Sequence, residues 1–102
     1  MKKFVPKYDR VLVIPIAQEL ESQGIILPES STEEQKAGIV TAVGEGRMVD
    51  GKLVPLTTKP SDVVLFGQYA GLEIEIEGRL FIVMRDEEIL GTLVEEKNEV
   101  NN

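Results

Sequence analysis

Three groups of residues have types and spacing that could support chemistry. Gly44-Glu45-Gly46 follows a β-branched run, as the glycines of a dinucleotide-binding loop do, but Val49 stands where the third glycine belongs and no crossover helix follows. Asp86-Glu87-Glu88 lacks the alternating oxygen ligands and the loop glycine of a calcium site. The glutamates of Leu72–Glu77 alternate with apolar residues, which is typical of the water-facing side of a strand. The sequence therefore predicts two turns and a solvated strand face here, with no catalytic residue and no metal site.

The composition excludes several classes of function. The chain has no histidine and no cysteine, so it lacks the commonest general base, the commonest metal ligand and any thiolate. Its 18 acidic and 11 basic residues give a formal charge of −7, which disfavours binding to nucleic acids and to anionic membranes. No apolar run is long enough to span a bilayer or to form the core of a signal peptide. We therefore expect a cytoplasmic protein that is not an enzyme and binds neither nucleic acid nor membrane.

The elements that must position any functional residue are short strands. Runs of β-branched or alternating apolar residues recur along the chain, at Arg10–Ile16, Gly38–Gly44, Asp62–Gly67, Leu72–Glu77, Leu80–Met84 and Gly91–Val94. Pro15 has no N–H for a ladder, so the first strand should end or lie at a sheet edge there. The short, closely spaced strands predict one all-β domain over residues 1–102, a small, irregular, closed or nearly closed β-barrel. Leu72, Ile74 and Ile76 are expected to face its interior.

Two connections are longer than the others. Asp50-Gly51 is the pair that a two-residue type I′ turn requires, which predicts a protruding hairpin at about residues 46–59. The tip of this hairpin comprises Val49, Asp50, Gly51 and Lys52. Residues 18–36 form the other connection, which is rich in glutamate, serine and threonine. A loop of this length in so small a domain is usually functional or disordered.

A single apolar segment interrupts the polar connection. By pattern alone, Ile25, Ile26 and Leu27 favour a short strand that packs on the barrel. The acidic and serine-rich residues on both sides are difficult to bury, which favours instead an exposed patch on a flexible segment. An exposed apolar patch of this kind marks a binding site for a partner. The residues themselves leave both interpretations open.

Several segments in succession resemble the GroES-type co-chaperonins. Pro6–Val13, with the sequence Pro-Lys-Tyr-Asp-Arg-Val-Leu-Val, is similar to the opening segment of that family, and Gly24–Glu29 resembles its mobile-loop motif. Gly38–Arg47 is similar to the strand that leads into the family's roof hairpin. Further matches follow in the same order up to about Leu93, at Asp62–Phe66, Tyr69–Ile74, Phe81–Met84 and Asp86–Leu90.

The resemblance implies a ring of identical subunits, typically a heptamer, that acts as a lid on a GroEL-type chaperonin. Each subunit of the ring carries a mobile loop. It implies a chaperonin-binding site on the mobile loop, formed by Gly24, Ile25, Ile26, Leu27 and Pro28. It implies a subunit interface between terminal strands, formed by Lys3, Phe4, Val5, Leu93 and Val94. Unfolded client proteins are then enclosed indirectly. ATP belongs to the chaperonin, so no cofactor is expected on this chain.

Two other classes of protein fit the sequence less well. A small β-barrel adaptor or ligand-binding module, such as an oligonucleotide-binding barrel, needs basic strands and stacking aromatic residues on one face, and this chain has neither. A small hydrolase is disfavoured by the lack of histidine and cysteine. The mass of the native assembly distinguishes these classes, because the lid forms a ring and the other two are expected to be monomers.

Overall fold

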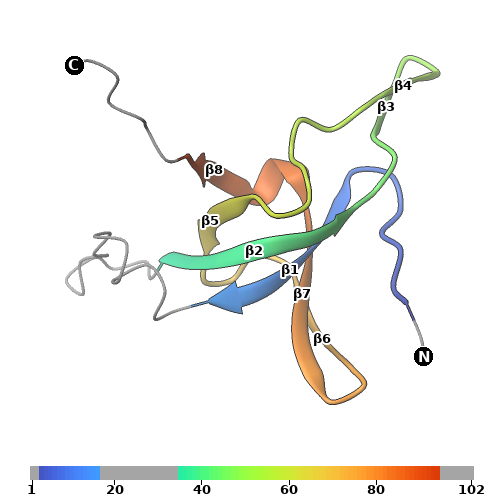
Figure 1. Ribbon diagram of the computed structural model, residues 1–102. Coiled ribbons are helices and arrows are strands. Elements are labelled where there is room, and N and C mark those ends of the chain that lie inside the picture. Colours follow the sequence, from blue (N-terminus) through green and yellow to red (C-terminus); the bar gives the residue numbers. More distant parts are fainter. Residues whose placement is uncertain (1–2, 17–34, 95–102) are drawn as a thin grey trace, which may run out of the picture.

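The computed structural model describes residues 3–16 and 35–94, and its regular structure is almost entirely β-strand (Figure 1). The strands are β1 (Arg10–Ile16), β2 (Gln35–Val43), β3 (Arg47–Val49), β4 (Lys52–Val54), β5 (Val63–Gly67), β6 (Leu72–Ile76), β7 (Arg79–Arg85) and β8 (Ile89–Leu93). A short 3-10 turn, η1 (Asp86–Glu88), joins β7 to β8. The all-β prediction is confirmed, and so is the turn predicted at Asp86-Glu87-Glu88.

Six strands form one antiparallel sheet in the order β6-β7-β1-β2-β5-β8, and β3 pairs with β4 in a separate ribbon. The edges of the large sheet are therefore β6 and β8. No pairing joins these two edges among the described residues, so the sheet is not closed by hydrogen bonds as the expected barrel would be. Register shifts at Leu12/Val13 in β1 and at Leu65/Phe66 in β5 are irregularities of the kind that bend strands.

The hydrophobic core comes from the four central strands. Val11 and Val13 alternate with Leu12 along β1, and the register places them opposite Met84 and Ile82 of β7. The buried residues that form one cluster are Val11, Val13, Val40, Val64, Phe66, Ile82 and Met84. Each such side chain gains about 1.5–3 kcal/mol when it leaves water. The core thus holds β7, β1, β2 and β5 together and includes no residue of the edge strand β6.

β1 has a neighbour on both sides over only part of its length. β7 pairs with residues 10–13, whereas β2 continues opposite β1 as far as Ile16. Pro15 therefore lies where β1 has a neighbouring strand on one side only, a position that tolerates its missing N–H. The expectation that the first strand ends or lies at an edge at Pro15 is met only locally, because β1 is an inner strand that pairs with β2 alone beyond Val13.

β6 forms a hairpin with β7 through a two-residue turn. Glu77 and Gly78 have φ values of 50° and 82°, the left-handed pair of a type I′ turn.

The prediction that Leu72, Ile74 and Ile76 all face a buried interior is wrong, because Leu72 is 68% exposed and the other two are half-buried. Alternation correctly indicates which residues share a face, but their burial depends on what packs against that face, and β6 is an edge strand.

Candidate functional site

The loop that connects β1 to β2 carries the predicted chaperonin-binding residues. These residues lie outside the described part of the chain and are Gly24, Ile25, Ile26, Leu27 and Pro28. The structure does place the two ends of this connection. Ile16, at the end of β1, lies opposite Ala37 of β2, so β1 ends and β2 begins at the same end of the sheet. Residues 35 and 36, which the sequence pattern assigned to the loop, belong to β2.

β3 and β4 form a two-stranded ribbon that projects from the large sheet (Figure 1). The predicted two-residue turn is present: Asp50 and Gly51 have φ values of 50° and 78°, and Val49 lies opposite Lys52 in the ladder. Every residue of both strands is exposed. The predicted tip residues are therefore all accessible to another molecule.

Residues 44–46 carry the chain from β2 into this ribbon. Gly46 has a φ of 139°, and its N–H donates to the Tyr8 carbonyl oxygen at 3.0 Å. A Cβ at position 46 would overlap the carbonyl oxygen of Val54, so the two legs of the ribbon approach too closely here for a side chain. The Gly46 amide binds a carbonyl group of the chain itself rather than facing a phosphate site. The interpretation of this segment as a turn is confirmed.

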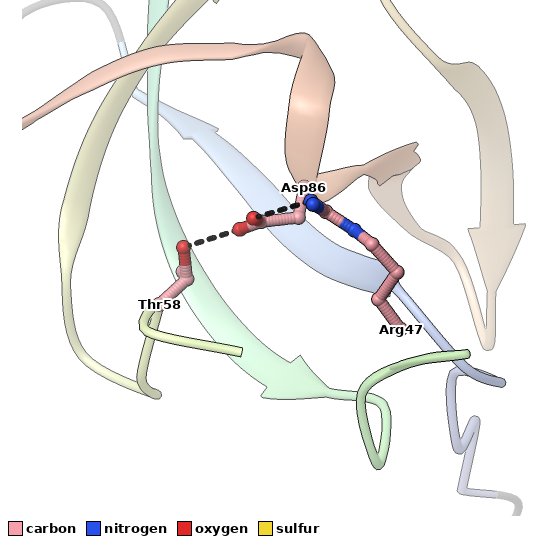
Figure 2. A network of polar contacts seen from close by, with 3 residues as sticks. All are labelled: Arg47, Thr58 and Asp86. Carbon is pink, nitrogen blue, oxygen red and sulfur yellow. Dashed lines mark hydrogen bonds and ion pairs between the residues drawn. The ribbon is translucent and has the colours of Figure 1, made fainter. Parts of the chain in front are cut away.

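One carboxylate on η1 contacts both legs of the ribbon (Figure 2). Asp86 Oδ1 accepts a hydrogen bond from Thr58 Oγ1 at 2.7 Å, and Asp86 Oδ2 lies 3.6 Å from a terminal guanidinium nitrogen of Arg47. Arg47 begins β3 and Thr58 follows β4, so the partners come from opposite legs. The sequence pattern indicated only a solvated turn at Asp86. It carried no signal of these contacts, because their partners are distant along the chain.

A second carboxylate holds the segment that precedes β1. Glu45 Oε1 accepts a hydrogen bond from the Tyr8 backbone N–H at 2.6 Å. Tyr8 has a φ of 55°, so the contact occurs where the chain turns toward β1. The pKa of Glu45 is lowered, mainly by the hydrogen bond from Tyr8. The backbone N–H of Glu45 itself and the charge of Lys7 lower it further. Ionised Glu45 thus helps to orient the N-terminal segment.

The predicted subunit-interface residues lie at two separate places, and all are exposed except Leu93, which is half-buried. Lys3, Phe4 and Val5 are exposed and are not part of a strand in the single subunit, and their expected pairing across a subunit boundary stays a prediction. A strand requires a ladder partner, and none pairs with this segment in the described parts of the chain. Leu93 ends β8, and Val94 follows it with 80% exposure. Figure 1 shows β8 and the N-terminal segment on opposite sides of the molecule, so one subunit does not bring the two sets together.

Within residues 3–16 and 35–94, no group of histidine, cysteine, aspartate and glutamate side chains is placed to hold a metal ion. Over the same ranges, no helix has the length and apolar character needed to cross a membrane.

Comparison with known proteins gives these surfaces a family context. The family model described as the chaperonin 10 kDa subunit matches residues 3–93. The chain belongs to this family. The resemblance found in the sequence is therefore confirmed, and the matched range includes the N-terminal segment, the ribbon and all of β8.

Individual relatives cover nearly the whole chain. Co-chaperonin GroES of Desulfosudis oleivorans is 45% identical over 93 residues, which are 89% of this chain and 98% of that protein. Co-chaperonin GroES of Aquifex aeolicus is 43% identical over 94 residues, which are 89% of this chain and 77% of that protein. The protein of the same name from Rickettsia canadensis is 44% identical over 92 residues, 88% of this chain and 97% of its own length.

Proposed function

We propose that this chain is a co-chaperonin that assembles into a homoheptameric ring, binds a GroEL-type chaperonin in the presence of nucleotide and closes its folding chamber. The observation that carries the proposal is the near full-length match to proteins named Co-chaperonin GroES, at 45% identity over 89% of this chain in one case. This match does not favour the alternative of a small β-barrel adaptor or ligand-binding module.

Ring assembly is supported by two complementary edges. β8 pairs with β5 on one side only, so its other side offers backbone groups to a further strand. Lys3, Phe4 and Val5 are exposed and have no ladder partner within the described subunit. We propose that they pair with Leu93 and Val94 of the next subunit. Because the two edges lie on opposite sides of the molecule, the contact is head-to-tail, and such contacts form a ring when the rotation closes (Figure 1).

The ribbon is proposed to form the roof of the lid. Its tip, Val49 to Lys52, projects from the sheet and is exposed. In a ring, the ribbons of all subunits project from the same face, because every subunit has the same orientation relative to the ring axis. Together they cover the end of the chamber that lies away from the chaperonin.

Chaperonin binding is proposed for Ile25, Ile26 and Leu27, with Gly24 and Pro28 beside them. Burial of three aliphatic side chains gains about 1.5–3 kcal/mol each. Ordering the backbone costs about 1–2 kcal/mol per residue, so a single loop gains almost no net free energy. Several loops on one ring make the later contacts intramolecular and raise the avidity by roughly 10²–10⁴. Weak individual contacts also let a conformational change in the chaperonin release the whole lid.

The proposed role needs no cofactor on this chain. ATP is bound by the chaperonin, and the lid subunit itself has no enzymatic activity. The absence of histidine and cysteine from the sequence supports a lid subunit without enzymatic activity. We place the assembly in the cytoplasm, where it encloses unfolded client proteins without recognising them individually.

Native mass spectrometry tests the proposal. The chain alone is expected at the mass of a heptamer, and a complex with a GroEL-type chaperonin is expected once nucleotide is added. A monomer that never joins the chaperonin contradicts the whole proposal and supports the adaptor. A ring that fails to bind with nucleotide present contradicts the lid function while leaving the assembly intact.

A further inference from the structure

The direction of the β3–β4 ribbon is not set by the large sheet. Each of its strands has three residues, and they pair with each other and with no other described strand. A two-stranded ribbon alone is marginally stable, and no residue of β3 or β4 is buried, so the two strands have little packing of their own to hold the ribbon. Its direction therefore depends on the contacts at its base.

Asp86 supplies a polar side-chain contact to each leg at that base, where Leu56 also packs against the core and the Gly46 N–H donates to the Tyr8 carbonyl oxygen. The two carboxylate oxygens of Asp86 are divided between the legs, one toward Thr58 and the other toward Arg47 (Figure 2). Thr58 is 7% exposed, whereas the Arg47 side chain is 48% exposed. The hydrogen bond from Thr58 is therefore shielded from water and charge-assisted, and it is the stronger contact. The ion pair to Arg47 is screened and weaker.

Hydrogen bonds from backbone N–H groups hold the turn that carries the Asp86 carboxylate. The Asp86 backbone N–H donates to the Asp9 carbonyl oxygen at 2.8 Å, which ties η1 to the segment before β1. Glu88 Oε1 accepts from the Arg85 N–H at 2.8 Å, which closes the turn on itself. The turn leads directly into β8. Asp86 is thus held by the sheet and not by the ribbon that it contacts.

We propose that Asp86 is a positioning residue for the ribbon: its contacts with Arg47 and Thr58 fix the direction in which the ribbon leaves the sheet. The consequence for the lid rests on the proposed function, in which the ribbons form the roof. A roof built from identical ribbons closes only if all of them point alike, so this contact, repeated in each subunit, sets its geometry. Because η1 precedes β8, the same residue links the roof to the proposed subunit interface.

The experiment measures the direction of the ribbon in the free protein. The chain has no native cysteine, so spin labels can be placed at Lys52→Cys on the ribbon and Glu73→Cys on β6. Labelled subunits are diluted with unlabelled ones, and the distance between the labels is measured by pulsed electron paramagnetic resonance. We expect one narrow distance peak in the otherwise native chain. Thr58→Val should lose this narrow peak and give a broad distribution, and Asp86→Ala should do so more strongly.

The controls separate positioning from general stability. Thr58→Ser keeps the hydroxyl group and should restore the narrow peak, whereas a purely steric role of Thr58 would not predict this rescue. Asp50→Asn removes a charge at the ribbon tip, where asparagine accepts the φ of 50°, and should leave the peak unchanged. Arg47→Met should broaden the peak less than Thr58→Val, and it remains informative if Asp86→Ala fails to fold.

A narrow peak that survives in both Thr58→Val and Arg47→Met would overturn the proposal. An equal broadening in Asp50→Asn and Thr58→Val would also overturn it, because loss of the base contact would then have no specific effect. The measurement needs no chaperonin. A chain that shows the expected peaks but never binds a chaperonin would support the positioning role and contradict the lid function.

Discussion

Gly38 of β2 faces the side chain of Val13 on β1 with no space for a side chain of its own. A Cβ at position 38 would overlap Val13 Cγ1 and would lie 2.8 Å from the Ile14 carbonyl oxygen and 3.3 Å from Phe66 Cε1. Val13 and Phe66 are fully buried members of the core. The close approach of two central strands at Gly38 is therefore part of the core packing.

Gly38→Ala is expected to lower the free energy of unfolding by about 1–3 kcal/mol, because the added methyl group forces apart strands that cannot move independently of the core. Denaturation with urea measures the loss. Gly67→Ala is the matched control on β5, since a Cβ there meets no atom within 4 Å, and it should change stability by less than about 0.5 kcal/mol. Equal losses in the two variants would contradict the role of the close contact.

Glu45→Gln keeps an acceptor oxygen near the Tyr8 N–H but removes the charge. Since folding lowers the pKa of Glu45, its ionised form contributes stability above its ordinary pKa, and this contribution is lost as the pH falls through the folded-state value. The variant should therefore be less stable than the parent at neutral pH, and the difference should disappear in acid. Urea denaturation at a series of pH values measures both.

Glu73→Gln, at an exposed carboxylate on β6, is the control for this change and should alter stability at neutral pH by less than about 0.5 kcal/mol. A difference between Glu45→Gln and the parent that stays constant from neutral to acid pH would assign the effect to side-chain shape and not to charge.

Ile26→Ser tests the proposed docking segment. A residue that contacts only the chaperonin contributes nothing to the free subunit, so the melting temperature and the mass of the ring should hardly change. Capture by a chaperonin with nucleotide should nevertheless be lost, because every loop of the ring carries the weakened contact. At a core position the same change would lower the free energy of unfolding by about 2–5 kcal/mol. Each kcal/mol lost would lower the melting temperature by roughly 4–8 °C. A variant that melts early but still binds would rule out the docking role.

Removal of either terminal segment tests the interface. Lys3–Val5 is exposed and unpaired in the sheet, and Leu93 is the last paired residue of β8. Deletion of residues 1–5, or of residues 93–102, should therefore release monomers that keep most of their β-structure. Native mass spectrometry and far-ultraviolet circular dichroism measure the two effects. A ring of full mass after both deletions would show that the subunits meet elsewhere.

The turns could be predicted from sequence because they depend on adjacent residues. Asp50-Gly51 and Glu77-Gly78 adopt positive φ values at both positions, and glycine and aspartate are among the residues that accept such values. The strands followed from their β-branched or alternating runs for the same local reason. The docking residues at positions 24–28 lie outside the described residues and remain a prediction.

What could not be predicted depends on contacts between distant segments. The Thr58–Asp86 hydrogen bond joins residues 28 positions apart, and its existence requires β7 to return beside the base of the ribbon. The exposure of Leu72 depends on the place of β6 at the edge of the sheet, which the alternation of its residues does not reveal. Whether Lys3–Val5 forms a strand likewise depends on a pairing partner, and no described strand of the subunit pairs with it.

The position of β1 between β2 and β7 has a consequence for folding during synthesis of the chain. β1 leaves the ribosome before β7, which supplies Ile82 and Met84 to the same core. A nascent chain without β7 leaves Val11 and Val13 uncovered. Joining segments so distant along the chain carries a large loop-closure entropy and slows folding. The subunit therefore cannot complete its core until β7 has left the ribosome and reached β1.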